Sequence, residues 1–374
     1  MKICHIIANP TVGGAEKYAL YLSEETKKSG NEVSFVLGSK GPLYDQCQTR
    51  STNTQGKLSN VTCLPARQEC QIVPMRSSFN PFLVMGSSLK LKKIFTEKKI
   101  DIVHTHFLRE QSLVIGSKIF GSKIKLVRTF HRLDQFNLKM KPILWLYRKK
   151  TDSFIAVSDI TAKYMVENGI KKEKITTIYN GAPEIKTEKH EKAMGYLGRV
   201  VAEKGILDFV KENEGILKEN RLVIAGEGED LSEIKKLRDT KNLNIEILGR
   251  VDDLSEFFSK ISLLILPTKG ESTFPLSVTE AFSAGVPVLS FDVEPISTIV
   301  KESRSGELVG LGNFKKMGQE AGRLLNNEAE IDKMSALARK LYQKKFTVSA
   351  MWRKTESLYK KLLSDKNSVS RIQD

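Results

Sequence analysis

The sequence predicts an α/β protein with two doubly wound halves, each built on a parallel sheet that carries helices on both faces. Apolar runs of strand length alternate with helix-period segments from end to end, which is typical of parallel sheets whose strands are joined by helices. The length of 374 residues is also too great for one ordinary core and suits two domains of roughly 150 to 200 residues each. We therefore expect two lobes with a cleft between them.

Five apolar runs mark the strands of the first half, and a helix is expected from Gly14 to Ser29. The runs are KICHII at 2–7, EVSFVL at 32–37, DIVHTH at 101–106, KLVRTF at 125–130 and SFIAVS at 153–158. The second half repeats the scheme with MGYLGR at 194–199, RLVIAG at 221–226, NIEILG at 244–249, SLLILP at 262–267 and VPVLSF at 286–291. Ligands of such sheets bind beyond the carboxyl ends of the strands, so the residues that follow these runs are the candidates for a site.

A turn-forming cluster, YNGAP at 179–183, marks the predicted domain boundary, because the charged stretch after it has no apolar period. We expect one domain over residues 1–179 and a second over 180–345. A closing amphipathic helix is predicted over about 346–374, where apolar residues recur near helical spacing: Met351, Trp352, Leu358, Tyr359, Leu362 and Leu363.

Cysteine usage and hydropathy both favour the cytoplasm. The cysteines Cys4, Cys47, Cys63 and Cys70 form no C-x-x-C pair and have no histidines at metal-ligand spacing, so no zinc site is expected. The chain also lacks an Asp-x-Asp motif, since Asp252 and Asp253 are adjacent, so no other metal site is expected. The apolar run at the amino terminus is too short for a signal peptide, and no run approaches the roughly 18 apolar residues of a membrane span. Any contact with a membrane would be peripheral, from the cytoplasmic side.

The net charge of +16 belongs almost entirely to the first half. Residues 1–150 hold 25 basic and 10 acidic side chains, against 35 and 34 in residues 151–374, and the segment 76–150 alone holds 17 basic and 4 acidic ones. An anionic membrane surface or a polyphosphate-linked acceptor would suit this segment, and the apolar residues 79–85 could enter the lipid interface. A solvated lysine-rich surface and a buried helix are the alternatives. Nucleic acid is not expected, because no binding motif is present and aromatic residues are not interleaved with the charges.

Two segments of the second half suit a diphosphate. Arg199 and Lys204 stand five residues apart in a glycine-bounded loop after a predicted strand, where a guanidinium fork and an ammonium can hold a pyrophosphate. The segment 268–285 follows the apolar run at 262–267. In it, Thr273 is a candidate N-cap and Pro275 suits the first turn of a helix, so its N–H groups would favour a phosphate. Gly285 is the expected carboxyl-terminal stop.

The first half offers weaker signals. Gly13 and Gly14 supply a turn without side chains between a strand and a helix, where backbone N–H groups can approach an anion. His104 and His106 end one predicted strand and His131 ends another. A histidine in such a place is more often a packing or hydrogen-bonding residue than a catalytic one.

Taken in order, these segments resemble the family 4 retaining glycosyltransferases of the GT-B fold. The likeness covers nearly the whole chain. It runs through GGAE at 13–16, DIVHTH, TFH at 129–131, IAVS at 155–158, IYNG at 178–181, GRVVAEKG at 198–205, LVIAGEG at 222–228, LGRVDD at 248–253 and EAFSAGVPV at 280–288. The resemblance implies transfer of a sugar from a nucleotide diphosphate donor to a glycan or lipid-linked acceptor, as in cell-surface polysaccharide synthesis, with no cofactor and no metal. The first domain would face the acceptor, the carboxyl-terminal helix would pack back on it, and the second domain would bind the donor.

The resemblance also implies a role for particular residues. Arg199 and Lys204 match the family's diphosphate-binding pair, Gly14 its amino-terminal loop, and His131 a histidine beside the donor sugar. Glu280 matches the acid that holds the ribose, and the backbone of residues 248–251 should face the base. Retention would follow from attack on the front face, with the leaving phosphate helping to deprotonate the acceptor. The remaining donor-binding residues that we expect are Gly13, Gly249, Arg250, Val251, Ser272, Thr273, Phe274, Pro275 and Leu276.

One position departs from the family's Glu-x7-Glu element. Ser272 stands where the first acid belongs, and the nearest carboxylate, Glu271, lies one residue earlier. A one-residue bulge before the helix would still bring Glu271 to the hydroxyls of the sugar, and we count it among the catalytic residues. The departure supports one alternative, a non-catalytic accessory subunit. A UDP-sugar 2-epimerase, which has the same two-lobed fold and binds a nucleotide sugar, is another alternative, and the basic first domain argues against it. An NAD-dependent dehydrogenase is disfavoured, because the glycines at 226 and 228 lack a third and stand among acids that would repel a pyrophosphate.

Overall fold

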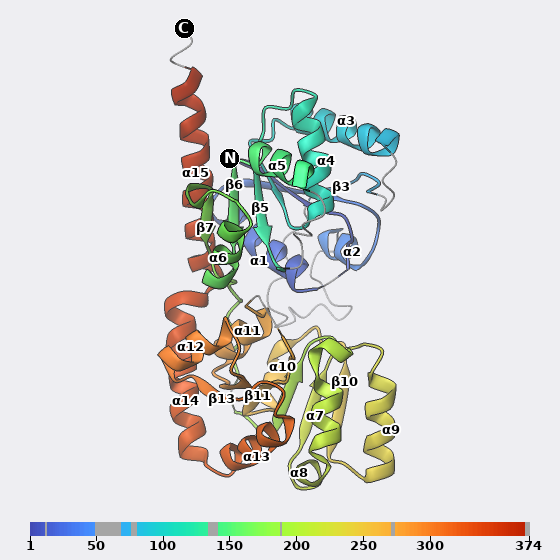
Figure 1. The fold of residues 1–374 in the computed structure, drawn as a ribbon, viewed down its shortest axis with the longest axis vertical. Helices are drawn as coiled ribbons and strands as arrows, with labels where there is room; N and C mark the ends of the chain where they lie inside the picture. Colours follow the sequence, from blue (N-terminus) through green and yellow to red (C-terminus); the bar gives the residue numbers. More distant parts are fainter. Residues whose placement is uncertain are drawn as a thin grey trace, which may run out of the picture. The chain divides into compact units, whose positions relative to one another are not determined.

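The computed structural model describes residues 1–11, 13–48, 69–75, 81–133, 141–187, 189–270 and 274–370. It divides into two compact units, one made of residues 1–180 and 348–374 and the other of residues 181–347. Each unit is a parallel sheet with helices on both faces, which confirms the predicted fold class (Figure 1).

The first unit has a parallel sheet in the order β3-β2-β1-β4-β5-β6-β7. Its strands are β1 (Lys2–Ile7), β2 (Glu32–Leu37), β3 (Glu69–Ile72), β4 (Ile102–Thr105), β5 (Lys125–Phe130), β6 (Ser153–Ala156) and β7 (Ile175–Thr177). Its helices are α1 (Gly14–Lys28), α2 (Pro42–Gln48), α3 (Pro81–Glu97), α4 (Leu108–Ile119), α5 (Lys141–Lys150), α6 (Asp159–Glu167) and α15 (Val348–Ser370). The strand order reverses between β1 and β4, so the loops after these two strands flank the switch point where ligands of such sheets bind.

Both faces of this sheet are buried, which explains why its strands are near-continuous apolar runs. Cys4 and Ile6 of β1 point to one face, where they pack with Leu91 of α3 and Leu113 of α4. Ile3 points to the other face, which α1 and α15 cover. Alternate residues of one strand thus belong to different layers, and His5 lies on the same face as Ile3.

The second unit has the order β10-β9-β8-β11-β12-β13, again all parallel. Its strands are β8 (Met194–Leu197), β9 (Leu222–Ala225), β10 (Ile245–Gly249), β11 (Leu263–Leu266), β12 (Val288–Phe291) and β13 (Gly306–Val309). Its helices are α7 (Ile206–Glu212), α8 (Glu214–Glu219), α9 (Leu231–Lys241), α10 (Leu254–Ser259), α11 (Leu276–Ala284), α12 (Ile296–Ser303), α13 (Phe314–Leu325) and α14 (Glu328–Leu341). Here the order reverses between β8 and β11.

Most predicted elements are confirmed, with corrections at their ends. The strand predicted through His106 ends at Thr105, and His131 directly follows β5 instead of ending it. Helix α11 begins at Leu276 with Pro275 as its N-cap residue, so Pro275 precedes the first turn. The proline still fits, because an N-cap residue is extended and Pro275 has a ψ of 138°. Gly285 ends α11 in the left-handed conformation, as predicted.

Within the described residues, none of the helices is both long and apolar enough to cross a membrane.

Candidate active site

In the first unit, the loop between β1 and α1 lies at the β1–β4 switch point. The backbone N–H of Gly13 donates to Oε2 of Glu16 at 3.0 Å, which fixes the turn at the start of α1. Gly14 is exposed, and a Cβ built on it would meet nothing within 4 Å. The helix therefore begins beside open space, where an anion can approach its first N–H groups.

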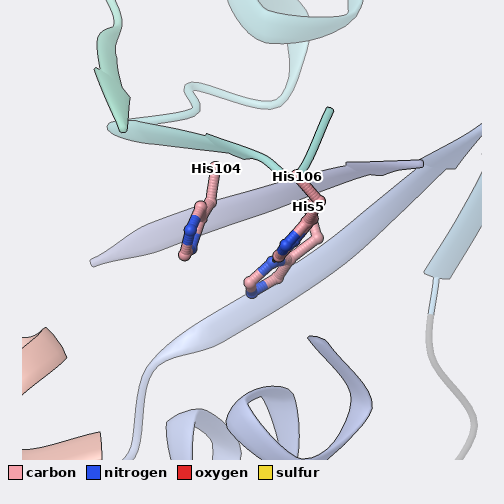
Figure 2. A group of neighbouring side chains, drawn as sticks. All are labelled: His5, His104 and His106. Atoms are coloured by element: carbon pink, nitrogen blue, oxygen red, sulfur yellow. The ribbon is translucent and has the colours of Figure 1, made fainter. Parts of the chain in front are cut away.

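Four histidines lie together on the face of the sheet that α1 and α15 cover. His5 of β1 is in register with His104 of β4, and His106 and His131 follow β4 and β5. Figure 2 shows His5, His104 and His106 reaching from neighbouring strands, and the centroids of their rings lie 4.7 to 5.4 Å apart. The fold thus brings His131, predicted from the sequence, together with His104 and His106 and with the distant His5.

Ring-to-ring hydrogen bonds connect three of these histidines in a row. Nδ1 of His5 lies 3.1 Å from Nε2 of His106, and Nδ1 of His106 lies 3.1 Å from Nε2 of His131. His104 stands outside the row, because its Nδ1 lies 2.7 Å from the hydroxyl of Tyr359 and its Nε2 lies 2.7 Å from that of Thr129. Two tyrosines of this layer, Tyr18 of α1 and Tyr359 of α15, meet the imidazoles edge-on.

Burial keeps all four imidazoles uncharged at neutral pH. It lowers the pKa of His5 to about 3, and burial together with the Arg128 guanidinium lowers the pKa of His131 to about 3. The pKa values of His104 and His106 also lie well below the usual range, chiefly because of burial and then because each faces other histidines. An uncharged imidazole carries one proton and therefore has one donor and one acceptor nitrogen.

His5, His104 and His106 could in principle bind a metal ion, since one ring nitrogen from each lies within 4.8 Å of the others. Both nitrogens of His104 and of His106 are already hydrogen-bonded to protein groups. A metal ion would have to displace these bonds, so the described geometry favours a hydrogen-bonded cluster.

The opposite face of the same sheet holds a buried ionisable pair that the sequence did not reveal. Oε1 of Glu110 accepts the N–H of Ala8 at 2.7 Å, and burial raises the pKa of this carboxyl. Burial also lowers the pKa of Arg128 to about 9, although the charge of Glu110 opposes that shift, and Arg128 donates to Gln111. The available signal was Arg128 inside the apolar run of β5, whereas Glu110 stands among polar residues and carries no such signal.

In the second unit, the loop after β8 carries Arg199 and Lys204 beside the β8–β11 switch point. Arg199 is exposed and pairs with Glu203, whereas Lys204 is partly buried. This loop contacts the segment after β11, because the N–H of Lys269 donates to the carbonyl of Glu203 at 3.4 Å. The two segments predicted for a diphosphate are thus neighbours within this unit.

Close backbone approach requires glycine in these loops, as Gly205 and Gly226 illustrate. Gly205 has a φ of 69°, and a Cβ on it would lie 2.1 Å from the carbonyl oxygen of Pro267. A Cβ on Gly226 would lie 1.8 Å from the carbonyl oxygen of Gly198. The glycine at 226, which also suggested a dinucleotide motif, is therefore needed for packing between the loops after β8 and β9.

The remaining predicted donor residues follow β10 and β11. Gly249 ends β10 with a φ of 67°, partly buried Val251 follows it, and Arg250 between them is exposed and pairs with Asp252 at 3.4 Å. Phe274 and Leu276 are buried, and the ring of Phe274 stacks on that of Phe346 at 5.2 Å. Glu280 is buried in α11. Glu271, Ser272 and Thr273 lie outside the described residues, so the fit of the displaced acid stays a prediction.

Helix α3 exposes an apolar surface followed by lysines. Phe82 is 77% exposed, and Leu83, Met85 and Leu89 are each more than 40% exposed. Lys90, Lys93 and Lys99 are exposed further along. The alternative of a buried helix between strands is therefore wrong for these residues, whereas residues 79 and 80 lie outside the described part of the chain.

Sequence models of known protein families match both units. The sequence model of glycosyltransferase family 4 matches residues 12–184, and that of the group 1 glycosyl transferases matches residues 191–327. The capsular polysaccharide biosynthesis glycosyltransferase CapM of Staphylococcus aureus is 24% identical over 79% of this chain and 85% of its own length. The N-acetyl-α-D-glucosaminyl L-malate synthase of Bacillus anthracis is 24% identical over 96% and 97%.

A relative from Escherichia coli, the UDP-Gal:α-D-GlcNAc-diphosphoundecaprenol α-1,3-galactosyltransferase, is 24% identical over 84% of this chain and 85% of its own length. Among solved structures, HepE of Anabaena in complex with UDP superposes with a TM-score of 0.79 at 15% identity, covering 96% of this chain and all of HepE. At this identity the likeness shows the fold, which has two Rossmann-like domains.

Proposed function

The chain belongs to the family 4 and group 1 glycosyltransferases, and from this membership we propose that it is a retaining enzyme that moves a sugar from a nucleoside diphosphate to a glycan or lipid-linked acceptor. The observation that carries the proposal is the match of both units to sequence models of glycosyltransferase families. Relatives named for capsular polysaccharide and for a diphosphoundecaprenol acceptor support a place in cell-surface polysaccharide synthesis.

The second unit is proposed to hold the donor. Arg199, Lys204 and the start of α11 would neutralise the diphosphate, Glu280 would hold the ribose, and the backbone of residues 248–251 would face the base. Arg199 pairs with Glu203 across an exposed surface. Such pairs contribute little free energy, so a diphosphate could displace this one. UDP is the first nucleotide to test, since HepE was solved with it.

The proposed reaction exchanges one bond at the anomeric carbon for another on the same face of the sugar. The acceptor oxygen bonds to this carbon as its bond to the diphosphate breaks, and the hydroxyl proton passes to the departing phosphate oxygen. The products are the glycosylated acceptor and a nucleoside diphosphate. His131 would hydrogen-bond the donor sugar, and Glu271 would bind its hydroxyls.

A thermal-shift screen with nucleoside diphosphates and nucleotide sugars tests the donor. A true donor binds the folded state and raises the melting temperature, in proportion to the logarithm of its concentration above Kd. Nucleotide release is then measured with each stabilising donor, with and without acceptors. Release that depends on an acceptor supports a transferase. Release of a free isomeric sugar without acceptor indicates an epimerase, and binding without any release indicates an accessory subunit.

The acceptor set should include both chemistries found among the relatives. One relative is named for a diphosphoundecaprenol-linked sugar and another for L-malate. The basic first half and the exposed apolar surface of α3 favour the lipid-linked acceptor. Turnover with L-malate and none with any lipid-linked sugar would contradict this choice.

We also propose that α3 docks on an anionic membrane, with Phe82, Leu83, Met85 and Leu89 at the interface. Its lysines would then lie near the lipid headgroups, each contributing about 1 kcal/mol. Co-sedimentation with anionic vesicles should weaken roughly tenfold or more in Lys90→Gln/Lys93→Gln, whereas Lys235→Gln/Lys236→Gln, the same change of charge on exposed residues of α9, should have little effect. Equal binding of the wild-type protein to neutral and anionic vesicles at low salt would remove the electrostatic part of this proposal.

A further inference from the structure

The row His5–His106–His131 has the geometry of continuous ring-to-ring hydrogen bonding. Each pair of neighbours has nitrogens 3.1 Å apart and ring centroids 5.4 Å apart, with interplanar angles of 17° and 26°. Rings so nearly parallel at this separation meet edge to edge, which points the N–H of one ring at the lone pair of the next. The row starts inside the sheet at β1 and ends at His131, which is partly exposed.

The hydrogen bonds along a row of uncharged imidazoles can all be donated in only one of two directions. His106 has one proton and uses both nitrogens, so it donates to one neighbour and accepts from the other. If His5 donates to His106, then His106 donates to His131, and the proton of His131 must be on Nδ1. If the direction is reversed, His131 donates from Nε2 and its Nδ1 is a bare acceptor.

The inner end of the row favours one direction. Nε2 of His5 is buried, and none of the described residues forms a hydrogen bond with it. His104 does not supply one, because both of its nitrogens are engaged elsewhere. The ring of His5 faces that of Phe35, with centroids 5.4 Å apart. Buried N–H groups without an acceptor are rarer in proteins than buried acceptors without a donor, so the lone pair belongs on Nε2 of His5 and the proton on its Nδ1.

We propose that His5 and His106 fix His131 as the Nδ1–H tautomer, so that His131 presents a hydrogen-bond donor, and not a base, to the substrate. The proposal rests on the proposed function, in which His131 contacts the donor sugar. His5 and His106 are then positioning residues. His131 would recognise an oxygen that accepts hydrogen bonds, such as a sugar hydroxyl or a phosphate oxygen.

The surroundings of His131 agree with this role. Burial and the Arg128 guanidinium both lower the pKa of His131, so solvent does not protonate this ring at neutral pH. The hydrogen bonds of the row are therefore kept. Tyr18 of α1 meets the ring edge-on, with centroids 4.9 Å apart. The nitrogen outside the row, Nδ1, is the one left to meet a ligand.

Nitrogen NMR of the wild-type protein labelled at histidine tests the tautomer directly. The chain has five histidines, and the fifth, His190, lies in the other unit, so assignment by single substitution is feasible. The expected spectrum shows His131 and His106 protonated on Nδ1. A proton on Nε2 of His131 would overturn the proposal, whatever the enzyme's activity. This measurement needs no substrate, so its failure is distinct from failure of the proposed function.

Three variants test the influence of the row. His106→Leu should leave His131 as a mixture of tautomers and lower kcat roughly tenfold, as expected for losing one ordinary hydrogen bond in the transition state. His106→Gln, which can still donate, should restore part of the tautomer preference and part of kcat. His104→Gln, a matched change outside the row, should leave the tautomer of His131 unaltered. An unaltered His131 tautomer in folded His106→Leu would contradict the proposal.

Discussion

Arg199 and Lys204 lie in one loop but have different surroundings. Arg199 is mostly exposed and forms an ion pair with Glu203, whereas Lys204 is partly buried in the short turn between β8 and α7. A partly buried ammonium is less screened by water, so its attraction for a diphosphate is stronger. Lys204 is therefore expected to matter more for turnover than Arg199.

Replacing Lys204 by alanine should lower kcat/KM about 100-fold, because a positive group facing the leaving diphosphate stabilises charge that develops in the transition state. The melting temperature should stay close to that of the wild type. Lys211→Ala, on an exposed position of α7, is the control and should leave both quantities unchanged. Wild-type kinetics in Lys204→Ala would remove the diphosphate assignment.

Substitution by alanine is expected to have opposite effects on the free energy of unfolding at Gly226 and at Gly215. Gly226→Ala should lower the free energy of unfolding by about 2–4 kcal/mol, since its Cβ would meet the carbonyl of Gly198 at 1.8 Å and displace a loop. Gly215→Ala, in α8 with nothing within 4 Å, should raise it by up to about 1 kcal/mol. Urea denaturation measures both, and a neutral Gly226→Ala would contradict the described packing of these loops.

At the scale of elements, most of the strands that the sequence predicted are interior strands buried on both faces, and β10 is a predicted strand that lies at an edge. β1, β5, β8 and β11 are apolar runs bounded by turn residues, so their positions follow from hydropathy alone. The strands that it missed, β3, β7 and β13, each lie at the edge of a sheet. Their sequences ECQI, ITT and GELV are short and partly polar. An edge strand has fewer apolar neighbours, so hydropathy marks it weakly.

The candidate site could be predicted only in part, for a different reason. The sequence located His104, His106 and His131 near strand ends, but the row depends on the pairing of β1 with β4 and of β4 with β5. His5 sits in the middle of β1 and carries no local signal of a site. Tyr359 reaches His104 from a helix 255 residues away in the chain. Only the folded structure fixes such partners.

Helix α15 completes the layer over the histidines, which predicts a large cost for truncating its buried face. Trp352 is 3% exposed, packs with Tyr359 and donates its indole N–H to Ser29 at 2.6 Å. Trp352→Ala should lower the free energy of unfolding by about 3–5 kcal/mol. The neighbouring Arg353→Ala, on the exposed face, should change it by less than about 0.5 kcal/mol. Thermal or urea denaturation followed by circular dichroism distinguishes the two.

For the molecule as a whole, the uncharged histidines predict a loss of stability in mild acid. Their folded pKa values lie below the ordinary value of 6.5, so below that pH the unfolded chain binds protons that the folded chain does not. Stability is complete above about pH 6.5 and falls as the pH drops toward about 3, by at most about 1.4 kcal/mol per pH unit for each histidine. Glu16 and Glu110, whose pKa values are raised, act in the opposite sense but are fewer.

Urea denaturation between pH 7.5 and 5.5 measures this dependence. The free energy of unfolding should decrease as the pH falls, and His104→Gln should make the decrease shallower by removing one of the four groups. A free energy that is constant or increases toward pH 5.5 would contradict the description of these histidines as buried and uncharged.

The chain leaves the first unit at residue 180 and returns to it at residue 348, after the whole second unit. Ala182 and Thr347 form a β-bridge, so the outgoing and returning segments lie side by side within the second unit. During translation, the first unit must therefore wait for α15 until the ribosome has made the second, roughly 10 to 30 seconds at ordinary elongation rates. Until then Tyr18 and His104 lack their cover, and the half of the protein that is synthesised first becomes the half whose folding finishes last.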